Sequence, residues 1–370
     1  MIIEFKKEDF LKSLQVVISA IKKGNLYQIL DCVLIDASKN NISLIAQDGK
    51  EISIKKEAMG DIIEKGKAAI DGRYLLDIIR TMPDDSFINL NVNEKKECII
   101  SCGENNKTKL QAKDEETYPN IISVNKEKRI LLNEYKLRKI IEKTIFSYDK
   151  NNESGNIVLK GIYFNLKNGI LQVKSMDGYI VSIINERVNE DKESYEAIIP
   201  GSALEELYKI LNGEVEKDIN IYFNEKNVSF EFDGTLFTSI IIPNNYIDTD
   251  RIFNVDHSTK VTLNKKDFFE CLNRSITVLR ENDNKPVIFD IKENKMEINL
   301  NSLYGESHQE LEINKSGKDL MIAFNAKNLI KILRVLNDEN INLFFSGAKQ
   351  PVIIKDKQET YSYLLTPVKI

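Results

Sequence analysis

The chain has 370 residues, of which 42% are hydrophobic and 29% charged, and its formal net charge is −5. These values are typical of a folded globular protein and exclude wholesale disorder, and at roughly 150 residues per domain the length predicts two or three domains. The sequence has no apolar run of the roughly 20 residues that a membrane helix needs, and its N-terminus lacks the features of a signal peptide. We therefore expect a cytoplasmic protein with no membrane partner.

Cysteine and histidine are scarce. The chain has four Cys, too few for a disulfide framework, and two His. Cys98 and Cys102 lie four residues apart, but no second pair or nearby His completes a zinc site, so buried inert thiols are the favoured interpretation. The sequence contains no GxSxG, P-loop, HExxH or Rossmann run. We expect no metal, no cofactor and no catalysis; an enzyme that uses the abundant carboxylates is the weaker alternative.

The predicted elements repeat along the chain with a period of about 125 residues. Each block opens with an amphipathic helix, continues with alternating strands around turns such as Asp48-Gly49 and Asp177-Gly178, and then has a second helix followed by more strands. This order predicts an α+β chain of three tandem domains, each with two helices packed on antiparallel sheets. The expected domains and helices are 1–127 with 5–23 and 71–82, 128–254 with 132–150 and 200–211, and 255–370 with 263–283 and 325–336.

The second helices match one another most closely. Stacked without gaps, Leu75, Leu204 and Leu329 coincide. They begin an apolar stripe spaced i, i+3, i+4, i+7, which is typical of the buried face of an amphipathic helix. The stripe continues through Ile78, Leu207 and Ile332, then Ile79, Tyr208 and Leu333, then Met82, Leu211 and Leu336.

The opposite face of these helices is basic. Arg80, Lys209 and Arg334 share one stacked position, and Arg73, Ser202 and Lys327 lie seven residues earlier on the same face. The six expected helices with their flanking residues carry 20 Lys/Arg and 15 Asp/Glu, whereas the whole acidic chain has 52 and 57. Such a surface can contact phosphates weakly and without base readout. A solvated helix face with ordinary lysines is the alternative.

The whole chain resembles the bacterial sliding clamp family, the β subunit of DNA polymerase III. The resemblance is carried by the order and spacing of LLDIIRTMP, YPNI, GIYFNL, MDGYIVSI, FTSIIIP and the ending YSYLLTPVKI. It implies a head-to-tail homodimer that forms a closed ring, with duplex DNA threaded through it and helices lining the hole. It also implies protein partners: a polymerase III alpha-type subunit, the clamp loader and other proteins with a clamp-binding motif.

The family pattern also implies three sets of site residues. The DNA-facing set is Lys22, Lys23, Arg73, Arg80, Lys136, Lys139, Lys209, Lys327 and Arg334. The partner-peptide pocket is Leu159, Met176, Gly178, Tyr179, Val181, Tyr246, Arg251, Ile252, Pro351, Leu364, Thr366, Pro367, Val368 and Lys369. The dimer interface includes Lys107, Leu110, Val278 and Leu279, with a strand near 107–112 pairing with one near 297–301.

Two alternatives within this fold stay open. Three positions depart from the family pattern, Gln28, Thr108 and Ile180, which is compatible with a divergent accessory clamp. A three-domain scaffold for protein interactions that does not encircle DNA would share the same repeats. Mass in solution and retention on circular DNA would separate these hypotheses from the replicative clamp.

Overall fold

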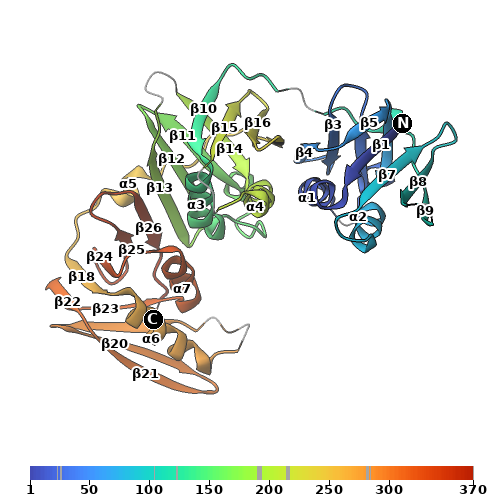
Figure 1. The fold of residues 1–370 in the computed structure, drawn as a ribbon. Coiled ribbons are helices and arrows are strands. Elements are labelled where there is room, and N and C mark those ends of the chain that lie inside the picture. The colour runs from blue at the N-terminus through green and yellow to red at the C-terminus, as the bar shows by residue number, and fades with distance from the viewer. Residues whose placement is uncertain are drawn as a thin grey trace. The chain divides into compact units, whose positions relative to one another are not determined.

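The computed structural model describes residues 1–22, 24–25, 27–103, 105–121, 124–189, 194–213, 217–280, 283 and 285–369 (Figure 1). Lys23 of the DNA-facing set lies outside these residues. The chain divides into two compact units, Met1–Lys136 with Ser202–Ile241, and Leu137–Gly201 with Ile242–Ile370. The middle repeat therefore contributes to both units.

The first unit contains two antiparallel sheets within its described residues. Its strands are β1 Ile2–Lys6, β2 Cys32–Asp36, β3 Ile42–Gln47, β4 Ile52–Ala58, β5 Asp61–Glu64, β6 Lys67–Asp71, β7 Phe87–Val92, β8 Glu97–Cys102, β9 Asn106–Gln111, β10 Arg129–Asn133, β15 Asp218–Phe223, β16 Asn227–Phe232 and β17 Thr235–Ile240. Its helices are α1 Lys7–Ile18, α2 Gly72–Thr81 and most of α4 Gly201–Ile210, with 3₁₀ turns η1 Gln28–Asp31 and η2 Glu115–Thr117. The strand orders are β5-β1-β7-β8-β9 and β10-β15-β16-β17-β4-β3-β2-β6.

The second unit repeats this architecture. Its strands are β11 Gly161–Lys167, β12 Ile170–Met176, β13 Ile180–Arg187, β14 Tyr195–Pro200, β18 Thr259–Asn264, β19 Val287–Lys292, β20 Lys295–Ser302, β21 Gly305–Glu312, β22 Asn314–Gly317, β23 Leu320–Phe324, β24 Asn340–Phe345, β25 Val352–Lys355 and β26 Tyr361–Leu365. Its helices are most of α3 Glu134–Thr144, α5 Asp250–Phe253, α6 Lys265–Ser275 and α7 Ala326–Val335, with η3 Ile145–Ser147, η4 Ile157–Lys160 and η5 Ile276–Val278. The strand orders are β14-β11-β12-β13-β26-β25-β24-β18-β22 and β21-β20-β19-β23.

One sheet in each unit is continuous across a boundary between repeats. In the first unit β4 pairs antiparallel with β17, which places Ile54 opposite Phe237. In the second unit β13 pairs antiparallel with β26, which places Val181 opposite Leu364. Backbone hydrogen bonds therefore join consecutive repeats, and each junction covers two strand edges that would otherwise be exposed. The predicted boundaries near residues 127 and 254 lie outside the strands and stay predictions.

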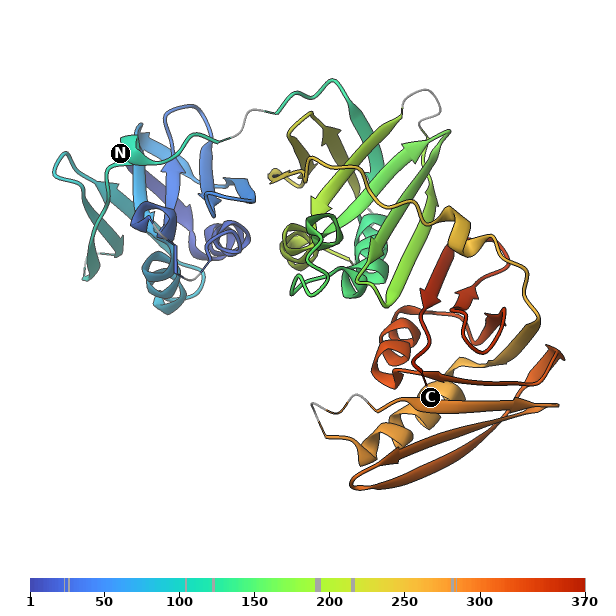
Figure 2. The same ribbon diagram turned by 180° about the vertical axis from the view of Figure 1, so that it is seen from behind.

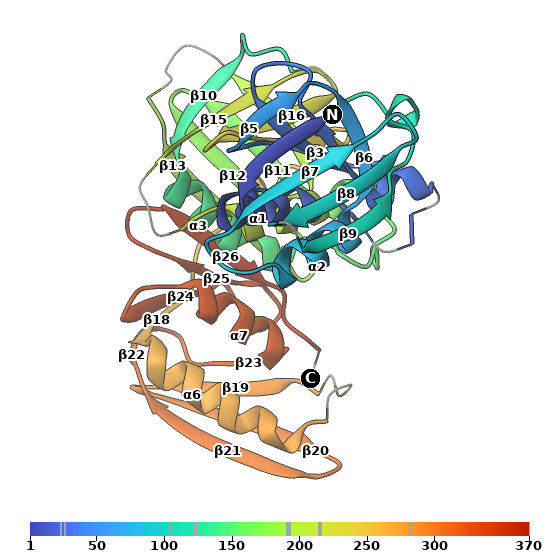
Figure 3. The same cartoon turned by 45° about the vertical axis from the view of Figure 1, so that its right-hand side comes forward.

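The apolar stripe predicted for the second helices is buried except at Ile78 and Tyr208, which are half-buried. Leu75, Leu204 and Leu329 are all at most 1% exposed. The side chain of Asp71 caps α2 by accepting from the backbone amides of Arg73 and Tyr74, and Asn325 caps α7 in the same way. In the first repeat α1 and α2 lie side by side (Figure 2), and in the third repeat α6 and α7 do (Figure 3).

The predicted bounds of the first helices are wrong at both ends. Each predicted segment includes the end of a strand, because β1, β10 and β18 run directly into α1, α3 and α6. The α-helices also end early, at Ile18, Thr144 and Ser275, and η3 and η5 follow the last two. β-branched residues such as Ile276, Thr277 and Val278 crowd the preceding turn and weaken the helix at this point. Amphipathic periodicity alone did not locate either boundary.

The first residue of each first helix binds the end of the second helix in its own repeat. The ammonium of Lys7 donates to the carbonyl of Met82 at 2.5 Å, and that of Lys265 donates to the carbonyl of Leu336 at 2.8 Å. In the middle repeat Glu134 occupies this position and instead accepts from the backbone amide of Asn212. These bonds satisfy backbone groups that a helix end leaves unpaired.

Candidate functional site

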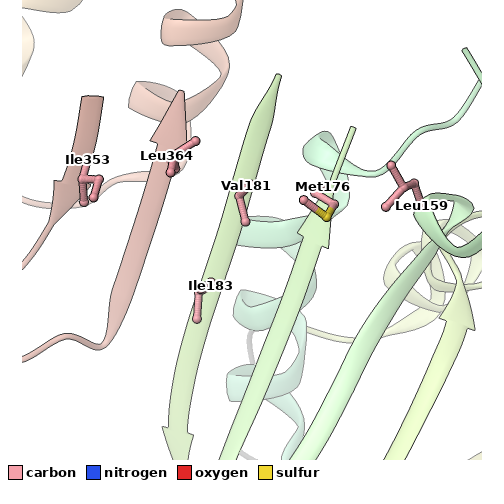
Figure 4. Packing of buried hydrophobic residues seen from close by; sticks show 6 residues of the cluster. All are labelled: Leu159, Met176, Val181, Ile183, Ile353 and Leu364. Carbon is pink, nitrogen blue, oxygen red and sulfur yellow. The ribbon is translucent and has the colours of Figure 1, made fainter. Parts of the chain in front are cut away.

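An apolar row crosses the sheet where the second and third repeats join. Met176 of β12 lies opposite Val181 of β13, Val181 lies opposite Leu364 of β26, and Leu364 lies opposite Ile353 of β25. Directly paired residues of antiparallel strands point to the same face of a sheet. Four strands from two repeats therefore place their apolar side chains side by side, as Figure 4 shows. We call these four residues the apolar row.

Further apolar side chains extend the apolar row into a cluster. Leu159 of η4 and Ile183, two residues beyond Val181 on the same strand face, are 5% and 6% exposed and belong to the cluster. Tyr246, Phe253 and Phe344 are partly buried and pack against it. Strands therefore form the base of the cluster, and the segment that links the second and third repeats lies along its border.

Tyr246 holds that linking segment against the sheet. Its ring stacks on Tyr163 of β11 with centroids 5.0 Å apart and planes 4° apart. The Tyr163 hydroxyl donates to Glu196 at 2.7 Å. Burial raises the pKa of the Tyr246 hydroxyl, an effect that the Met176 backbone amide opposes only in part. The hydroxyl stays protonated at neutral pH, so this wall of the cluster is uncharged.

The rim of the cluster is formed by exposed residues. Tyr179 is 57% exposed, Ile252 40% and Val368 38%. The C-terminal tail is fixed at two points: the Thr366 amide donates to the Tyr179 carbonyl of the rim at 2.9 Å, and the Val368 amide donates to the Ala323 carbonyl of β23 at 2.8 Å. The tail therefore has a defined course beside the apolar row.

Gly178 shapes the turn that carries Tyr179. Its φ is +92°, in the region that favours glycine, and a Cβ there would meet no atom within 4 Å. Asp177 accepts from the amides of Tyr179 and Ile180 at 2.9 and 2.8 Å. Burial nevertheless raises the pKa of Asp177, and the charge of Lys331 offsets this only in part.

The structure brings together only part of the predicted pocket set. Leu159, Met176, Val181, Tyr246 and Leu364 share the cluster, whereas Arg251 is exposed on α5 and Pro351 directly precedes β25. Gly178, Tyr179, Ile252, Thr366, Pro367, Val368 and Lys369 lie on the turn, α5 and the tail. Sequence reasoning missed Ile183, Phe253, Phe344 and Ile353. For Ile183 the strand alternation from Val181 could have indicated the shared face. The role of all these residues as partner contacts stays a prediction.

The described DNA-facing residues lie on or next to helices. Arg73, Arg80, Lys136, Lys209 and Arg334 are exposed, and Lys139 and Lys327 are half-buried. Neighbouring carboxylates lie on the same helices: Asp77 is 4.0 Å from Arg80, Glu142 is 2.9 Å from Lys139, and Glu206 is 2.8 Å from Lys209. These pairs reduce the net positive charge that the helices present.

Lys22 has a structural partner. Its ammonium lies 2.7 Å from Asp48 and 3.3 Å from Glu51, both in the β3–β4 turn. Burial alone would lower the pKa of Lys22, but the two carboxylates outweigh it and raise the pKa. The charge of Lys22 is therefore largely compensated within the chain, which makes it a weaker phosphate contact than its position in the sequence suggested.

Two of the strands that end their sheets bear on the predicted dimer interface, within the described residues. β9, which carries Lys107 and Leu110, pairs only with β8, and β21 pairs only with β20. The predicted interface strand at 297–301 is wrong, because it belongs to β20 and is hydrogen-bonded on both sides, to β19 and β21. Val278 and Leu279 are half-buried at the end of η5, near the β20–β21 turn: the Ser302 hydroxyl donates to the Val278 carbonyl at 2.7 Å.

The described residues contain no group of three or more His, Cys, Asp or Glu that could hold a metal ion. Burial raises the pKa of the Cys98 thiol to about 12, which keeps this side chain in its unreactive protonated form. No described helix is long and apolar enough to span a membrane.

Comparison with known proteins gives a consistent result over the whole chain. Family models of the DNA polymerase III beta subunit match residues 1–122 (N-terminal domain), 131–248 (central domain) and 250–369 (C-terminal domain). A beta sliding clamp of Staphylococcus epidermidis is 27% identical over 374 residues, covering 98% of each chain. A crystal structure described as a DNA polymerase III beta subunit from Eubacterium rectale is 33% identical with a TM-score of 0.96, covering 100% of this chain and 99% of the other. The DNA polymerase sliding clamp of Bacillus subtilis is 25% identical with a TM-score of 0.95, at 100% and 99% coverage.

Proposed function

The chain belongs to the DNA polymerase III beta subunit family of non-catalytic sliding clamps, and we propose that two copies close into a ring around duplex DNA. In this proposal the ring tethers a polymerase III alpha-type subunit to its template and confers processivity. The tether is topological, so it needs no tight grip on DNA. The three-domain clamp fold and the absence of a catalytic role follow from family membership.

The observation that carries the ring is the pattern of strand junctions. In each repeat the first three strands after the first helix are neighbours in one sheet: β2-β3-β4, β11-β12-β13 and β19-β20-β21. The three strands after the second helix are likewise neighbours: β7-β8-β9, β15-β16-β17 and β24-β25-β26. At both internal junctions the last strand of the first set pairs antiparallel with the last strand of the second set in the next repeat, as β4 with β17 and β13 with β26. In the third repeat the last strand of the first set is β21, and in the first repeat the last strand of the second set is β9. Both strands end their sheets. A third junction of the same kind joins β21 of one copy to β9 of the other.

The charges on these edges favour that pairing. The exposed face of β9 carries Lys107 and Lys109, and that of β21 carries Glu306, Glu310 and Glu312. Lys109 also pairs with Glu97 of β8, and Glu310 with Lys295 of β20, so Lys107, Glu306 and Glu312 contribute most to the charge that each edge presents. A β9–β9 or β21–β21 contact would bring like charges together, which disfavours it, whereas β9–β21 pairs opposite charges. The junction is therefore head to tail, and by family membership it closes after two copies.

The DNA contact in this proposal is weak and independent of sequence. The exposed cations Arg80, Lys209 and Arg334 face the duplex, while a chain with net charge −5 repels phosphates elsewhere. Contacts of this kind are made to phosphates and carry no base readout. They permit sliding, because few counterions are released when the duplex is bound.

The partner site in this proposal is the apolar row with its rim. An apolar floor of Met176, Val181 and Leu364 suits a short linear motif with hydrophobic anchors. The rim supplies exposed Tyr179 and backbone groups of the tail for polar contacts. The polymerase subunit, the clamp loader and other clamp-binding proteins would compete for this one surface.

A charge swap tests the ring. The double variant Lys107→Glu, Lys109→Glu places two glutamates on β9 opposite the glutamates of β21 at each junction. It is expected to shift the dimer to monomer in sedimentation at micromolar concentration. Adding Glu306→Lys and Glu310→Lys to the same chain is expected to restore the dimer. Lys39→Glu, in the exposed β2–β3 turn, is the control for the loss of a surface cation. A wild-type chain that is strictly monomeric would contradict the ring and favour the interaction scaffold.

A further inference from the structure

Large apolar side chains are exposed in the β20–β21 turn and on α2. Leu303 and Tyr304, in the turn between β20 and β21, are 89% and 51% exposed. Tyr74, in the first turn of α2, is 64% exposed. Leu303 and Tyr304 are adjacent and lead into the edge strand β21, and such a pair favours a protein contact, whereas a single exposed apolar residue is ordinary surface. The internal junctions show what such a contact looks like.

Each internal junction has a second contact beside the paired strands, between a turn and the next repeat's second helix. In the first unit Glu51 of the β3–β4 turn accepts from the Ser202 hydroxyl of α4 at 2.7 Å. In the second unit Asp177 of the β12–β13 turn lies close enough to Lys331 of α7 for its charge to lower the pKa of Asp177. The corresponding turn of the third repeat is the β20–β21 turn.

The matching positions on α2 follow from the gapless alignment of the second helices. Ser202 aligns with Arg73, and Lys331 aligns with Asp77. The face of α2 that would receive the β20–β21 turn therefore runs from Arg73 to Asp77 and includes Tyr74. The Asp77 side chain is 72% exposed, although Arg80 lies 4.0 Å away.

We propose that Leu303 and Tyr304 of one copy pack on Tyr74 of the other, as the apolar centre of the ring closure. This inference rests on the proposed ring and adds its main specificity contact. The guanidinium of Arg280 lies 4.1 Å from the centre of the Tyr304 ring. When Tyr304 packs on Tyr74 of the other copy, Arg280 therefore approaches the exposed Asp77 of that copy. Val278 lines the same end of β21, since it is the side chain nearest to Gly305.

This contact assigns Arg73 to the ring junction instead of the DNA-facing set. The matching turns of the first two repeats carry the acidic residues Glu51 and Asp177, which face Ser202 and Lys331 within the chain. The β20–β21 turn has no acidic residue and presents Leu303 and Tyr304 instead. An obligate contact between two copies favours aromatic and aliphatic anchors at its centre, with charges at the rim. The β9 and β21 charges then set orientation, and the apolar turn supplies most of the affinity.

Sedimentation of two single variants tests the energetic claim. Tyr74→Ser and Leu303→Ser are each expected to raise the dimer dissociation constant about 30-fold, the effect of truncating an interface hot spot. The double variant is expected to raise the dissociation constant by less than the product of the two single effects, because both substitutions remove the same contact. Met59→Ser, at a 76% exposed apolar residue between β4 and β5, is the matched control and is expected to leave the constant unchanged.

Thiol cross-linking tests the geometry, at a protein concentration above the raised dissociation constant of the double variant. A Tyr74→Cys, Leu303→Cys chain treated with a short bis-maleimide is expected to give a covalent dimer, and a Met59→Cys, Leu303→Cys chain only monomer. If the wild type is a dimer but the first pair cross-links no better than the second, the turn contact is wrong and the ring stands. If the wild type is monomeric, the ring itself fails.

Discussion

Two aspartates occupy matching turns, Asp48 between β3 and β4 and Asp177 between β12 and β13, and they respond oppositely to their surroundings. Asp48 accepts from three backbone amides at 2.8 to 3.0 Å and pairs with Lys22. Burial alone would raise its pKa, but the Lys22 bond and the amides outweigh it and lower the pKa below 3.8. For Asp177 burial prevails, and the pKa is raised above 3.8.

The two shifts predict opposite effects of substitution by asparagine. Asp48→Asn keeps an oxygen for the amides but loses the charge that strengthens those bonds, and it leaves Lys22 without its nearest partner. We expect a loss of about 2 kcal/mol in the free energy of unfolding at pH 7. Asp177→Asn removes a carboxylate whose ionised form the fold disfavours, so stability at pH 7 should change by less than about 0.5 kcal/mol or rise.

The pH dependence follows from the same directions. The stabilisation by Asp48 is complete above its unfolded pKa near 3.8 and is lost as the pH falls through its lowered folded pKa. The penalty at Asp177 is complete above its raised folded pKa and vanishes as the pH falls below 3.8. Both variants should therefore approach the wild type in strong acid.

Urea unfolding followed by circular dichroism at pH 7, 5 and 3 measures these differences. Freshly prepared protein is required, because the new Asn-Gly sequences deamidate. Equal destabilisation by both variants at pH 7, or a loss in Asp48→Asn that persists at pH 3 unchanged, would refute the electrostatic reasoning and leave only turn geometry as the cause.

Three further predictions concern the partner site, the helix ends and the DNA-facing surface. Deleting residues 367–370 removes the exposed Val368 and Lys369 but leaves β26 intact. Affinity for a clamp-binding peptide should therefore fall at least about tenfold by fluorescence anisotropy while the dimer mass is unchanged; unaltered binding would refute the site. Lys265→Met removes the bond to the Leu336 carbonyl and should cost about 1 to 2 kcal/mol in thermal unfolding, and an unchanged midpoint would show that water replaces the ammonium. Reversal of three exposed helix cations together should shorten retention on circular DNA without changing the dimer, and normal retention would make them a solvated face. That triple variant is Arg80→Glu, Lys209→Glu and Arg334→Glu.

Local periodicity was enough to predict the repeat and its second helices. The stripe through Leu75, Leu204 and Leu329 depends only on spacing within one helix, and all three side chains are buried. The start of the first helices was not predictable in this way. Residues of β1 such as Phe5 are apolar and buried in a strand as they would be in a helix, and pairing with β5 and β7 decides the outcome.

The apolar row and the junction edges depend on contacts between distant residues. Val181 and Leu364 lie far apart in the sequence and meet only because β13 pairs with β26. Ile353 joins them through β25, and nothing in its own neighbourhood indicates this. For the same reason β20 was taken for an edge strand: the alternation of both hairpin strands is alike, and only the sheet order shows that β21 is the outer one. The family resemblance, and not spacing, named Leu159, Met176, Val181, Tyr246 and Leu364, which share the cluster; their role as a partner pocket stays a prediction.

Retention on DNA of different topology tests the central claim most directly. The chain is placed on a nicked circular duplex by a clamp loader, excess free protein is removed by gel filtration, and the bound fraction is followed before and after the circle is cut once. The account predicts that the protein stays on the circle through high salt and leaves within minutes of linearisation, because only closure around the duplex holds it. Loss from circular and linear DNA at the same rate would contradict a ring that encircles DNA.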